Sequence, residues 1–157
     1  MKTSMEERVG MKLHRRVIRR EATRAPEFVD ITDEIAAAVD ASGIHEGTVT
    51  VFSRHTTAAV KINENEPLLL EDMARFLARI APRDDDYRHN DFTIRTANMT
   101  EDECPNGHSH CQHLLLSASE TIPVCDGAPL LGRWQRVFLV ELDRPRPREV
   151  VIQVSGW

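Results

Sequence analysis

Three of the seven histidines of this 157-residue chain fall within six positions, in the segment 104–116 with the sequence CPNGHSHCQHLLL. If Asn106 caps a short helix, His110 and His113 lie three residues apart on one helical face. If the segment is extended, alternation instead places His108 and His110 on one face. Imidazole changes charge or binds metals near neutral pH, so both conformations predict a pair of groups suited to proton transfer or metal binding. The alternative is a polar helix start with solvated histidines.

The other groups that could carry chemistry also stand in loops or at the ends of predicted elements, where a rigid scaffold can aim them into one cleft. The full set is His55, Glu64, His89, His108, His110, His113 and Asp126. The sequence contains no HExxH and no paired CxxC, so metal ligands would have to converge from separate segments. It also lacks GxxxxGK[ST], GxGxxG and GxSxG, which argues against the standard phosphate-cradling loops and against a hydrolase with a nucleophile elbow.

Two further residues allow both a functional and a structural interpretation. Cys111, between His110 and His113, could be an activated thiolate, but a free cysteine before a leucine run is more often a core residue. Trp134 could stack on a planar ligand, although a tryptophan on a strand usually packs against its neighbours.

The composition is that of an ordinary globular domain, with 41% hydrophobic and 29% charged residues. Its apolar runs are far shorter than the ~20 residues needed to cross a bilayer. The charged N-terminus lacks the apolar region of a secretory signal. Three cysteines provide no paired framework, which predicts free thiols in a reducing compartment. We therefore expect a cytoplasmic protein without membrane contacts.

A net charge of −5 argues against general nucleic-acid binding, which depends on neutralising phosphates. The segment 12–24 is a local exception, because Glu21 is its one acidic residue. Its basic side chains, apart from a histidine, are Lys12, Arg15, Arg16, Arg19, Arg20 and Arg24. Such a run could contact phosphate, but on a strand it is more often a solvated face or a protected edge.

The hydrophobic pattern predicts an α+β protein. β-Branched and alternating segments predict strands at 12–20, 47–54, 58–62, 120–124, 133–142 and 150–154, with a polar bend at 55–57. Helical spacing predicts one helix over 28–42, capped by Asp30 or Thr32 and ended by Gly43. A second helix starts at Pro67 and ends before Pro82. The polar segment 82–105 has no clean periodicity, and a loop of this length is more often functional or mobile than neutral.

Five motifs in this order resemble the YjbQ or UPF0047 family, also called the secondary thiamine-phosphate synthase family. They are SRHTTAAVKINEN (53–65), YRHN (87–90), NGHSH (106–110), ETIPVCDG (120–127) and LGRWQRVFLVELD (131–143). The resemblance implies a compact single domain over 1–157, with 1–10 as a loose extension. It also implies a β-sandwich-like mixed sheet with two long helices and one short helix, often assembled as a homotrimer.

The resemblance also implies a site that contains a divalent metal. The metal ligands it implies are His55, His89 and His110, and the catalytic residues are His55, Glu64, His89 and Asp126. The substrate-binding residues it implies are Arg54, Thr56, Thr57, Asn63, Asn106, Trp134 and Gln135. His108 and His113 lie outside the family pattern. Imidazoles suit zinc and carboxylates suit magnesium, so the metal identity stays open, as does the question of whether subunits share the site.

The activity that the resemblance implies is thiamine-phosphate synthesis, in which a pyrimidine diphosphate joins a thiazole phosphate and pyrophosphate leaves. The expected partner is therefore a small phosphorylated substrate. Two alternatives remain. One is a metal-dependent hydrolase of a phosphorylated metabolite, and the other is a non-catalytic trimeric protein that binds a metal or a small ligand.

Overall fold

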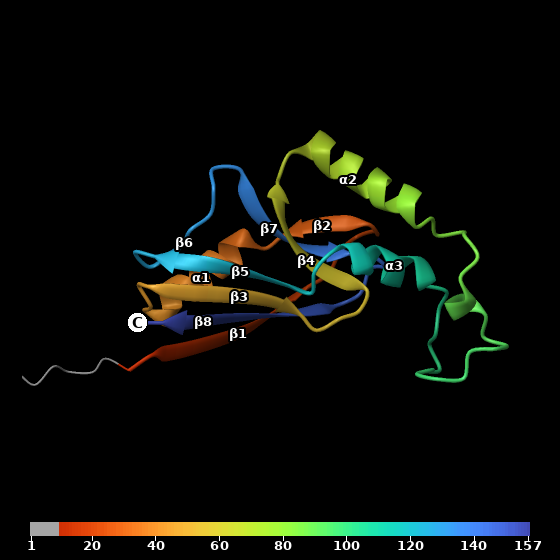
Figure 1. Cartoon of the computed structure of the whole chain (residues 1–157), viewed down its shortest axis with the longest axis horizontal. Coiled ribbons are helices and arrows are strands. Elements are labelled where there is room, and N and C mark those ends of the chain that lie inside the picture. The colour runs from red at the N-terminus through yellow and green to blue at the C-terminus, as the bar shows by residue number, and fades with distance from the viewer. Residues whose placement is uncertain (1–9) are drawn as a thin grey trace, which may run out of the picture.

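Two antiparallel sheets and three α-helices form residues 10–157, the part of the chain that the computed structural model describes (Figure 1). The five-stranded sheet has the order β1 (Lys12–Arg20), β8 (Arg148–Gly156), β3 (Gly47–Ser53), β5 (Ser119–Cys125) and β6 (Ala128–Pro129). The three-stranded sheet has the order β2 (Glu27–Asp30), β7 (Gln135–Glu141) and β4 (Ala58–Glu64). The helices are α1 (Thr32–Ser42), α2 (Pro67–Ile80) and α3 (Gly107–Leu115), with a 3₁₀ turn η1 (Arg88–Asn90). The predicted α+β class is confirmed, but the strand pairs within both sheets are antiparallel rather than mixed.

The two sheets share one hydrophobic core. Buried side chains of β3, β5 and β8 pack with those of β4 and β7 in a continuous cluster, to which α1 adds Ile35 and Val39. Strand β8 pairs with β1 on one side and β3 on the other, and its residues alternate strictly between buried and half-buried. Val150 and Ile152 therefore point into the core, as the period of two along a strand requires.

The segment 28–42 is a strand followed by a helix, so the prediction of one continuous helix is wrong at its start. The residues before α1 form β2, which pairs with β7. The Asp30 carboxylate then accepts hydrogen bonds from both the amide and the hydroxyl of Thr32. Gly43 ends α1 with a φ of 62°, as predicted. Pairing with a strand more than a hundred residues away overrides the local helical spacing here.

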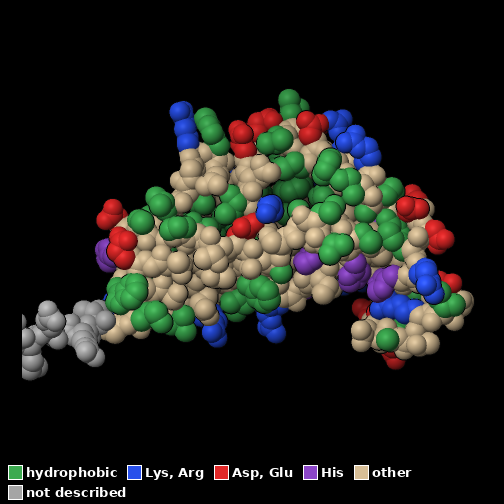
Figure 2. Space-filling view, viewed as in Figure 1, with side chains coloured by type: hydrophobic (Ala, Val, Ile, Leu, Met, Phe, Trp, Pro, Cys, Tyr) green, Lys and Arg blue, Asp and Glu red, His purple; other side chains and the backbone are tan. Residues whose placement is uncertain are grey.

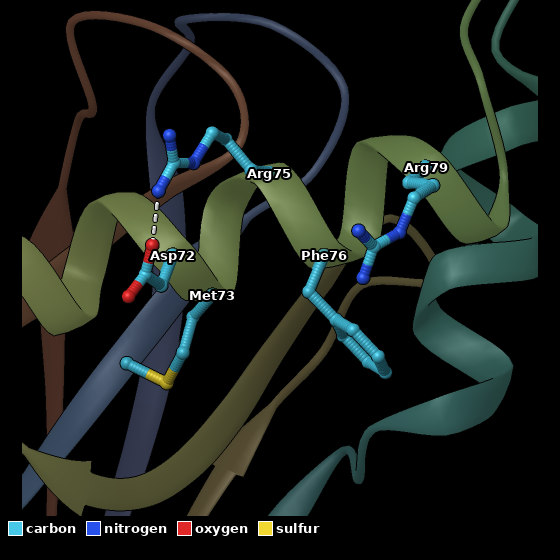
Figure 3. Close-up of a pocket in the computed structure, with 5 residues that line it drawn as sticks. All are labelled: Asp72, Met73, Arg75, Phe76 and Arg79. Carbon is cyan, nitrogen blue, oxygen red and sulfur yellow. Dashed lines mark hydrogen bonds and ion pairs between the residues drawn. The ribbon is translucent and has the colours of Figure 1, made fainter.

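Helix α2 begins where the sequence predicts. The Glu66 side chain accepts hydrogen bonds from two amides of the first turn, and Pro67 occupies the start of the helix. Among the side chains of α2, Leu77 alone is buried. Figure 3 shows Met73 and Phe76 extending from one side of α2, and Phe76 remains 50% exposed. Helix α2 therefore covers the three-stranded sheet while part of its apolar face stays open.

The segment between α2 and α3 is the irregular loop that the sequence predicts. It projects beyond the end of the sheets, next to α3 (Figure 1). Its one regular turn is η1, and an ion pair of 2.7 Å between Arg95 and Glu103 closes its outer part. The Tyr87 hydroxyl donates a hydrogen bond of 2.8 Å to the Pro82 carbonyl and fixes the start of the loop. These contacts hold His89 in a defined position.

The sequence allowed the basic segment 12–24 to be either a phosphate-contacting run or a solvated edge strand. In the structure most of it forms β1, a solvated strand at the edge of the five-stranded sheet. In β1, Arg19 pairs with Glu149 at 2.8 Å, and Arg15 donates a hydrogen bond to Gln153. The predicted N-terminal extension lies, except for Gly10, outside the described residues. All three cysteines are free, as predicted. None of the described helices is long and apolar enough to cross a membrane.

Candidate functional site

Helix α3 starts in close contact with η1. The backbone N–H of Gly107 donates a hydrogen bond of 2.8 Å to Oδ1 of Asn90. Asn90 therefore takes the role that the sequence suggested for Asn106, whose side chain makes no capping hydrogen bond. A Cβ atom at position 107 would lie 2.6 Å from Cβ of Tyr87. The absence of a side chain at Gly107 therefore allows the helix and the loop to approach this closely. The contact holds the loop against the start of α3.

As a result, His89 of η1 and His110 of α3 lie side by side. Their ring centroids are 4.7 Å apart and their planes are inclined by 65°. Burial lowers the pKa of His110 below its ordinary value, the nearby His89 ring lowers it further, and Asp143 opposes this. At neutral pH the His110 ring is therefore uncharged, with one N–H donor and one lone pair. The structure thus brings together two of the three histidines that the resemblance marks as metal ligands.

The other two histidines of α3 face the sheets. Burial, followed by the charge of Arg83, lowers the pKa of His108, while its contact with the backbone of Leu142 raises it. Burial lowers the pKa of His113 too, while its contact with the backbone of Ala58 in β4 raises it. Figure 2 shows histidine side chains gathered along α3. The histidine cluster predicted from the sequence is therefore a spatial cluster, extended by His89.

Several buried polar atoms in this region have no hydrogen-bond partner. In the described part of the chain all such side-chain atoms lie on α3, on the residue before it or on the connection between β7 and β8. They are Asn106 Oδ1, His108 Nδ1, Gln112 Oε1, His113 Nε2 and Arg146 Nε, together with Asp143 Oδ2, which makes no hydrogen bond but forms an ion pair with Arg146. A buried unpaired polar group costs about 1–3 kcal/mol, so their concentration in one place marks a site for a ligand or ordered water. Together with the adjacent His89–His110 pair they define the α3 site, which consists of His89, His108, His110, His113, Asp143 and Arg146.

The connection between β7 and β8 supplies charged groups that the sequence interpretation missed. Asp143 is fully buried, and its Oδ2 lies 2.9 Å from a guanidinium nitrogen of Arg146 and 3.8 Å from one of Arg144. The Cys104 thiol lies 3.9 Å from its Oδ1. Prolines between these arginines exclude a helix, and in an extended chain Arg144, Arg146 and Arg148 share one face. That alternation was the signal that could have identified them.

His55 lies in the turn between β3 and β4, where its Nε2 accepts a hydrogen bond of 2.9 Å from the backbone N–H of Glu149. The neutral ring therefore carries its proton on Nδ1. Burial lowers the pKa of His55, and the charges of Arg148 and Arg146 lower it further. Thr57 in the same turn accepts hydrogen bonds on its hydroxyl from Arg148 (3.0 Å) and Arg146 (3.2 Å). Through Arg146, the predicted turn is joined to the α3 site.

A pocket of about 300 Å³ opens beside His55. Three of the predicted substrate-binding residues line it together with residues of the β7–β8 connection. Its lining, named here the His55 pocket, consists of Arg54, His55, Thr56, Thr57, Arg146, Pro147 and Arg148.

The three histidines implied as metal ligands do not form a three-ligand set within one chain. Among residues 10–157, no group of three His, Cys, Asp or Glu side chains is arranged to hold a metal ion. His89 and His110 are adjacent, but a backbone amide occupies the Nε2 lone pair of His55. The donor set of one chain therefore does not fit a closed metal site, and metal binding by this trio stays a prediction.

Other predicted site residues lie at the far end of the three-stranded sheet. Glu64 is six residues along β4 from Ala58, which at ~3.3 Å per residue places it about 20 Å from the His113 contact. Asn63 contacts Met73 of α2, and the Gln135 side chain accepts a hydrogen bond from the amide of Gly132. These residues lie at the opposite end of β4 from the His113 contact, so one chain does not bring them to the α3 site.

The sequence left open whether Trp134 and Cys111 pack against neighbouring residues, and in the structure both are exposed. Trp134 is 61% exposed, and the guanidinium of Arg133 lies 4.6 Å from its ring centroid. Cys111 is exposed, and the adjoining leucine run leaves Leu114 82% exposed. The core interpretation of Cys111 is therefore wrong, and the Trp134 ring lies against Arg133 while most of its surface stays open to solvent.

Asp126, a predicted catalytic residue, lies in the hairpin turn between β5 and β6. Asp126 and Gly127 both have positive φ, 51° and 75°, which is the Asp-Gly geometry of a tight type I′ turn. Its amide donates a hydrogen bond to Glu46, and the neighbouring Gly127 packs near His45. Turn geometry explains this residue type, and its position is away from α3.

The pKa shifts of the buried histidines predict that the metal-free protein loses stability in mild acid. His55, His108, His110 and His113 all have a lowered pKa, with burial as the largest cause. As the pH falls below 6.5, the ordinary pKa of histidine, these histidines bind protons in the unfolded chain at pH values where they stay unprotonated in the folded protein. The free energy of unfolding should therefore fall as the pH drops from about 6.5 towards 5.

Urea denaturation at several pH values measures this slope. The His108→Gln variant should show a flatter profile, by at most about 1.4 kcal/mol per pH unit. An equally steep profile in the variant, or a flat profile in the wild-type protein, would contradict the prediction.

Comparison with known proteins assigns the family. The model of the UPF0047 protein YjbQ-like family matches residues 16–157. A UPF0047 protein of Methanothermobacter thermautotrophicus is 37% identical over 148 residues, covering 94% of this chain and 96% of that protein. A UPF0047 protein of Synechocystis is 39% identical over 138 residues, covering 86% and 87%. A crystal structure of a YbjQ-like protein of unknown function from Sulfolobus solfataricus superimposes with a TM-score of 0.84 at 34% identity, covering 94% of this chain and 100% of that chain. The chain therefore belongs to the YjbQ/UPF0047 family.

Proposed function

We propose that this protein is an enzyme that acts on a phosphorylated small molecule at the α3 site, with thiamine-phosphate-synthase-like chemistry. The observation that carries the proposal is the His89–His110 pair, with ring centroids 4.7 Å apart, beside a concentration of buried unpaired polar atoms. A fold rarely leaves such atoms unpaired unless a ligand or water uses them. The reaction class comes from the motifs that contain these histidines.

In the proposed reaction the bond between the pyrimidine methylene carbon and the diphosphate oxygen breaks, and its electron pair passes to the diphosphate. The thiazole nitrogen forms the new carbon–nitrogen bond. The main task of the protein is to stabilise the negative charge that develops on the leaving diphosphate. Neutral His110 donates a hydrogen bond to it, and Arg146 contributes positive charge. A divalent ion such as magnesium enters with the diphosphate as part of the substrate.

A coupling assay tests this function. The protein is incubated with the pyrimidine diphosphate, the thiazole phosphate and magnesium, and both thiamine phosphate and pyrophosphate are measured. We expect equal amounts of the two products and no pyrophosphate release when the thiazole phosphate is omitted. Saturable binding of both substrates without turnover would overturn the proposal in favour of a binding protein.

The neutral state of His110 also favours a second candidate, a hydrolase of a phosphorylated metabolite. Because burial and His89 lower the pKa of His110, its free lone pair could take a proton from an attacking water. In that case, phosphate or pyrophosphate would be released without the thiazole phosphate. The omission experiment therefore separates the two enzymes.

A further inference from the structure

We propose that the His55 pocket binds the phosphate group of the ligand, and that His55 donates a hydrogen bond to this group from Nδ1. The inference rests on the proposed function, since the phosphate belongs to the substrate of the neighbouring α3 site. It gives His55 the role of a hydrogen-bond donor, in place of the metal ligand that the resemblance implies.

The hydrogen bond at Nε2 determines what His55 can offer a ligand. The Glu149 amide donates to that nitrogen at 2.9 Å, so the Nε2 lone pair is occupied. A ring nitrogen that accepts a hydrogen bond must hold a lone pair, so the ring is neutral in this arrangement. A neutral imidazole that accepts on one nitrogen must carry its proton on the other. His55, which lines the pocket, therefore carries its N–H on Nδ1, and an N–H group suits an anionic oxygen and not a metal ion.

The two arginines at the pocket rim add donors that the fold leaves unused. Arg54 is 61% exposed, and its nearest acid, Glu149, lies 3.6 Å away with no hydrogen bond between them. Arg146 uses one terminal nitrogen for Asp143 and Thr57, and its other terminal nitrogen has no hydrogen-bond partner in the described residues. A guanidinium fork matches two oxygens of a phosphate. The pocket thus offers several convergent donors and few free acceptors.

Positive charge is crowded at this point of the molecule. Burial lowers the pKa of Arg146, and the charge of Arg148 lowers it further, followed by that of Arg144. The acids nearby are already engaged, because both oxygens of Glu141 bind Arg148 and Asp143 lies against Arg146. An anion in the pocket would relieve this repulsion between like charges.

The same arrangement accounts for the missing phosphate-binding loop. In P-loops and dinucleotide-binding folds, glycine-rich backbone amides hold the phosphate. Here the donors are side chains from two connections, the β3–β4 turn and the β7–β8 segment. Their sequence signal is the combination of SRHTT with the alternating RPRPR.

Calorimetric titration of inorganic phosphate and pyrophosphate into the full-length protein tests the pocket. We expect Arg54→Gln to weaken binding of both about tenfold or more, since it removes charge-assisted hydrogen bonds. Arg54 is exposed, so the variant should fold normally. The matched control is Arg75→Gln, which removes the same charge from a 77% exposed arginine on α2 and should leave binding unchanged.

The protonation state of His55 gives an independent readout in the wild-type protein. Nitrogen-15 NMR of the imidazoles should show the proton of His55 on Nδ1, and added phosphate should shift that proton downfield. A proton on Nε2, undetectable phosphate binding, or equal losses in Arg54→Gln and Arg75→Gln would each overturn the inference.

The outcomes also separate this inference from the proposed function. Phosphate binding that depends on Arg54, found together with a failed coupling assay, would retain the pocket and remove the synthase proposal. Full coupling activity and unchanged substrate KM in Arg54→Gln would retain the synthase and overturn the pocket.

Discussion

The His110→Ala variant is expected to lose about 10²- to 10³-fold in kcat for pyrophosphate release, the usual effect of removing one donor to a developing oxyanion. His110 contacts His89, and the lowered pKa keeps its ring neutral with an N–H group available at pH 7. The ring is partly exposed at the surface of α3, so its loss should leave the fold intact. Steady-state kinetics at saturating substrates, beside a thermal melt of each variant, measure the effect.

Two matched variants show which property of His110 matters. His110→Gln keeps an N–H donor but cannot titrate, so it should retain more activity than alanine if hydrogen bonding is the role. If His110 is instead the base of a hydrolase, glutamine and alanine should be equally inactive. His45→Ala removes an exposed histidine beside the β5–β6 hairpin turn and should behave as wild type. Equal losses at positions 110 and 45, or no loss at 110, would remove His110 from the mechanism.

Substituting Glu141 by glutamine should lower the free energy of unfolding by about 3–5 kcal/mol, as expected when one partner of a buried ion pair is removed. The Glu141 side chain is fully buried, and that of Arg148 is 3% exposed. Arg148 donates hydrogen bonds of 2.6 and 2.5 Å to the two carboxylate oxygens. The amides of Leu142 and Asp143 also donate to this carboxylate. Chemical denaturation of the two proteins gives the difference directly.

The double substitution Glu141→Leu and Arg148→Met provides the control, because apolar replacement of both partners removes the unpaired charge. We expect it to recover most of the stability lost in Glu141→Gln. It also removes the hydrogen bond of 3.0 Å from Arg148 to the Thr57 hydroxyl, so phosphate binding in the His55 pocket should weaken even where stability returns. A loss below about 1 kcal/mol in Glu141→Gln would show that the buried pair is not critical.

Most elements of this fold follow from local patterns. Alternating β-branched residues place β3, β4 and β8 close to their predicted bounds, and Pro67 and Gly43 mark helix ends as predicted. Strands β2 and β6 were not predicted. β6 is only two residues long, and the residues of β2 are compatible with helical spacing and become a strand by pairing with β7. Such a choice depends on a partner far along the chain and has no local signal.

The candidate site was predicted in part. Residue types and spacing alone identify the histidine cluster of α3 and the polar turn at His55. They do not show that η1 places His89 against His110, or that Asn90 caps α3 through Gly107. They also group Glu64 and Asp126 with the histidines, although Glu64 lies at the opposite end of β4 and Asp126 occupies a hairpin turn.

The sequence by itself determined the α+β class, the family and the supply of imidazoles, because periodicity and motif order are local properties of the chain. The tertiary structure alone decided which of these groups meet. Arg146 and Arg148 reach Thr57 across about ninety residues of chain, and the amide of Glu149 fixes the proton of His55. Convergence and protonation depend on contacts between distant segments and on burial, which exist only once the chain has folded.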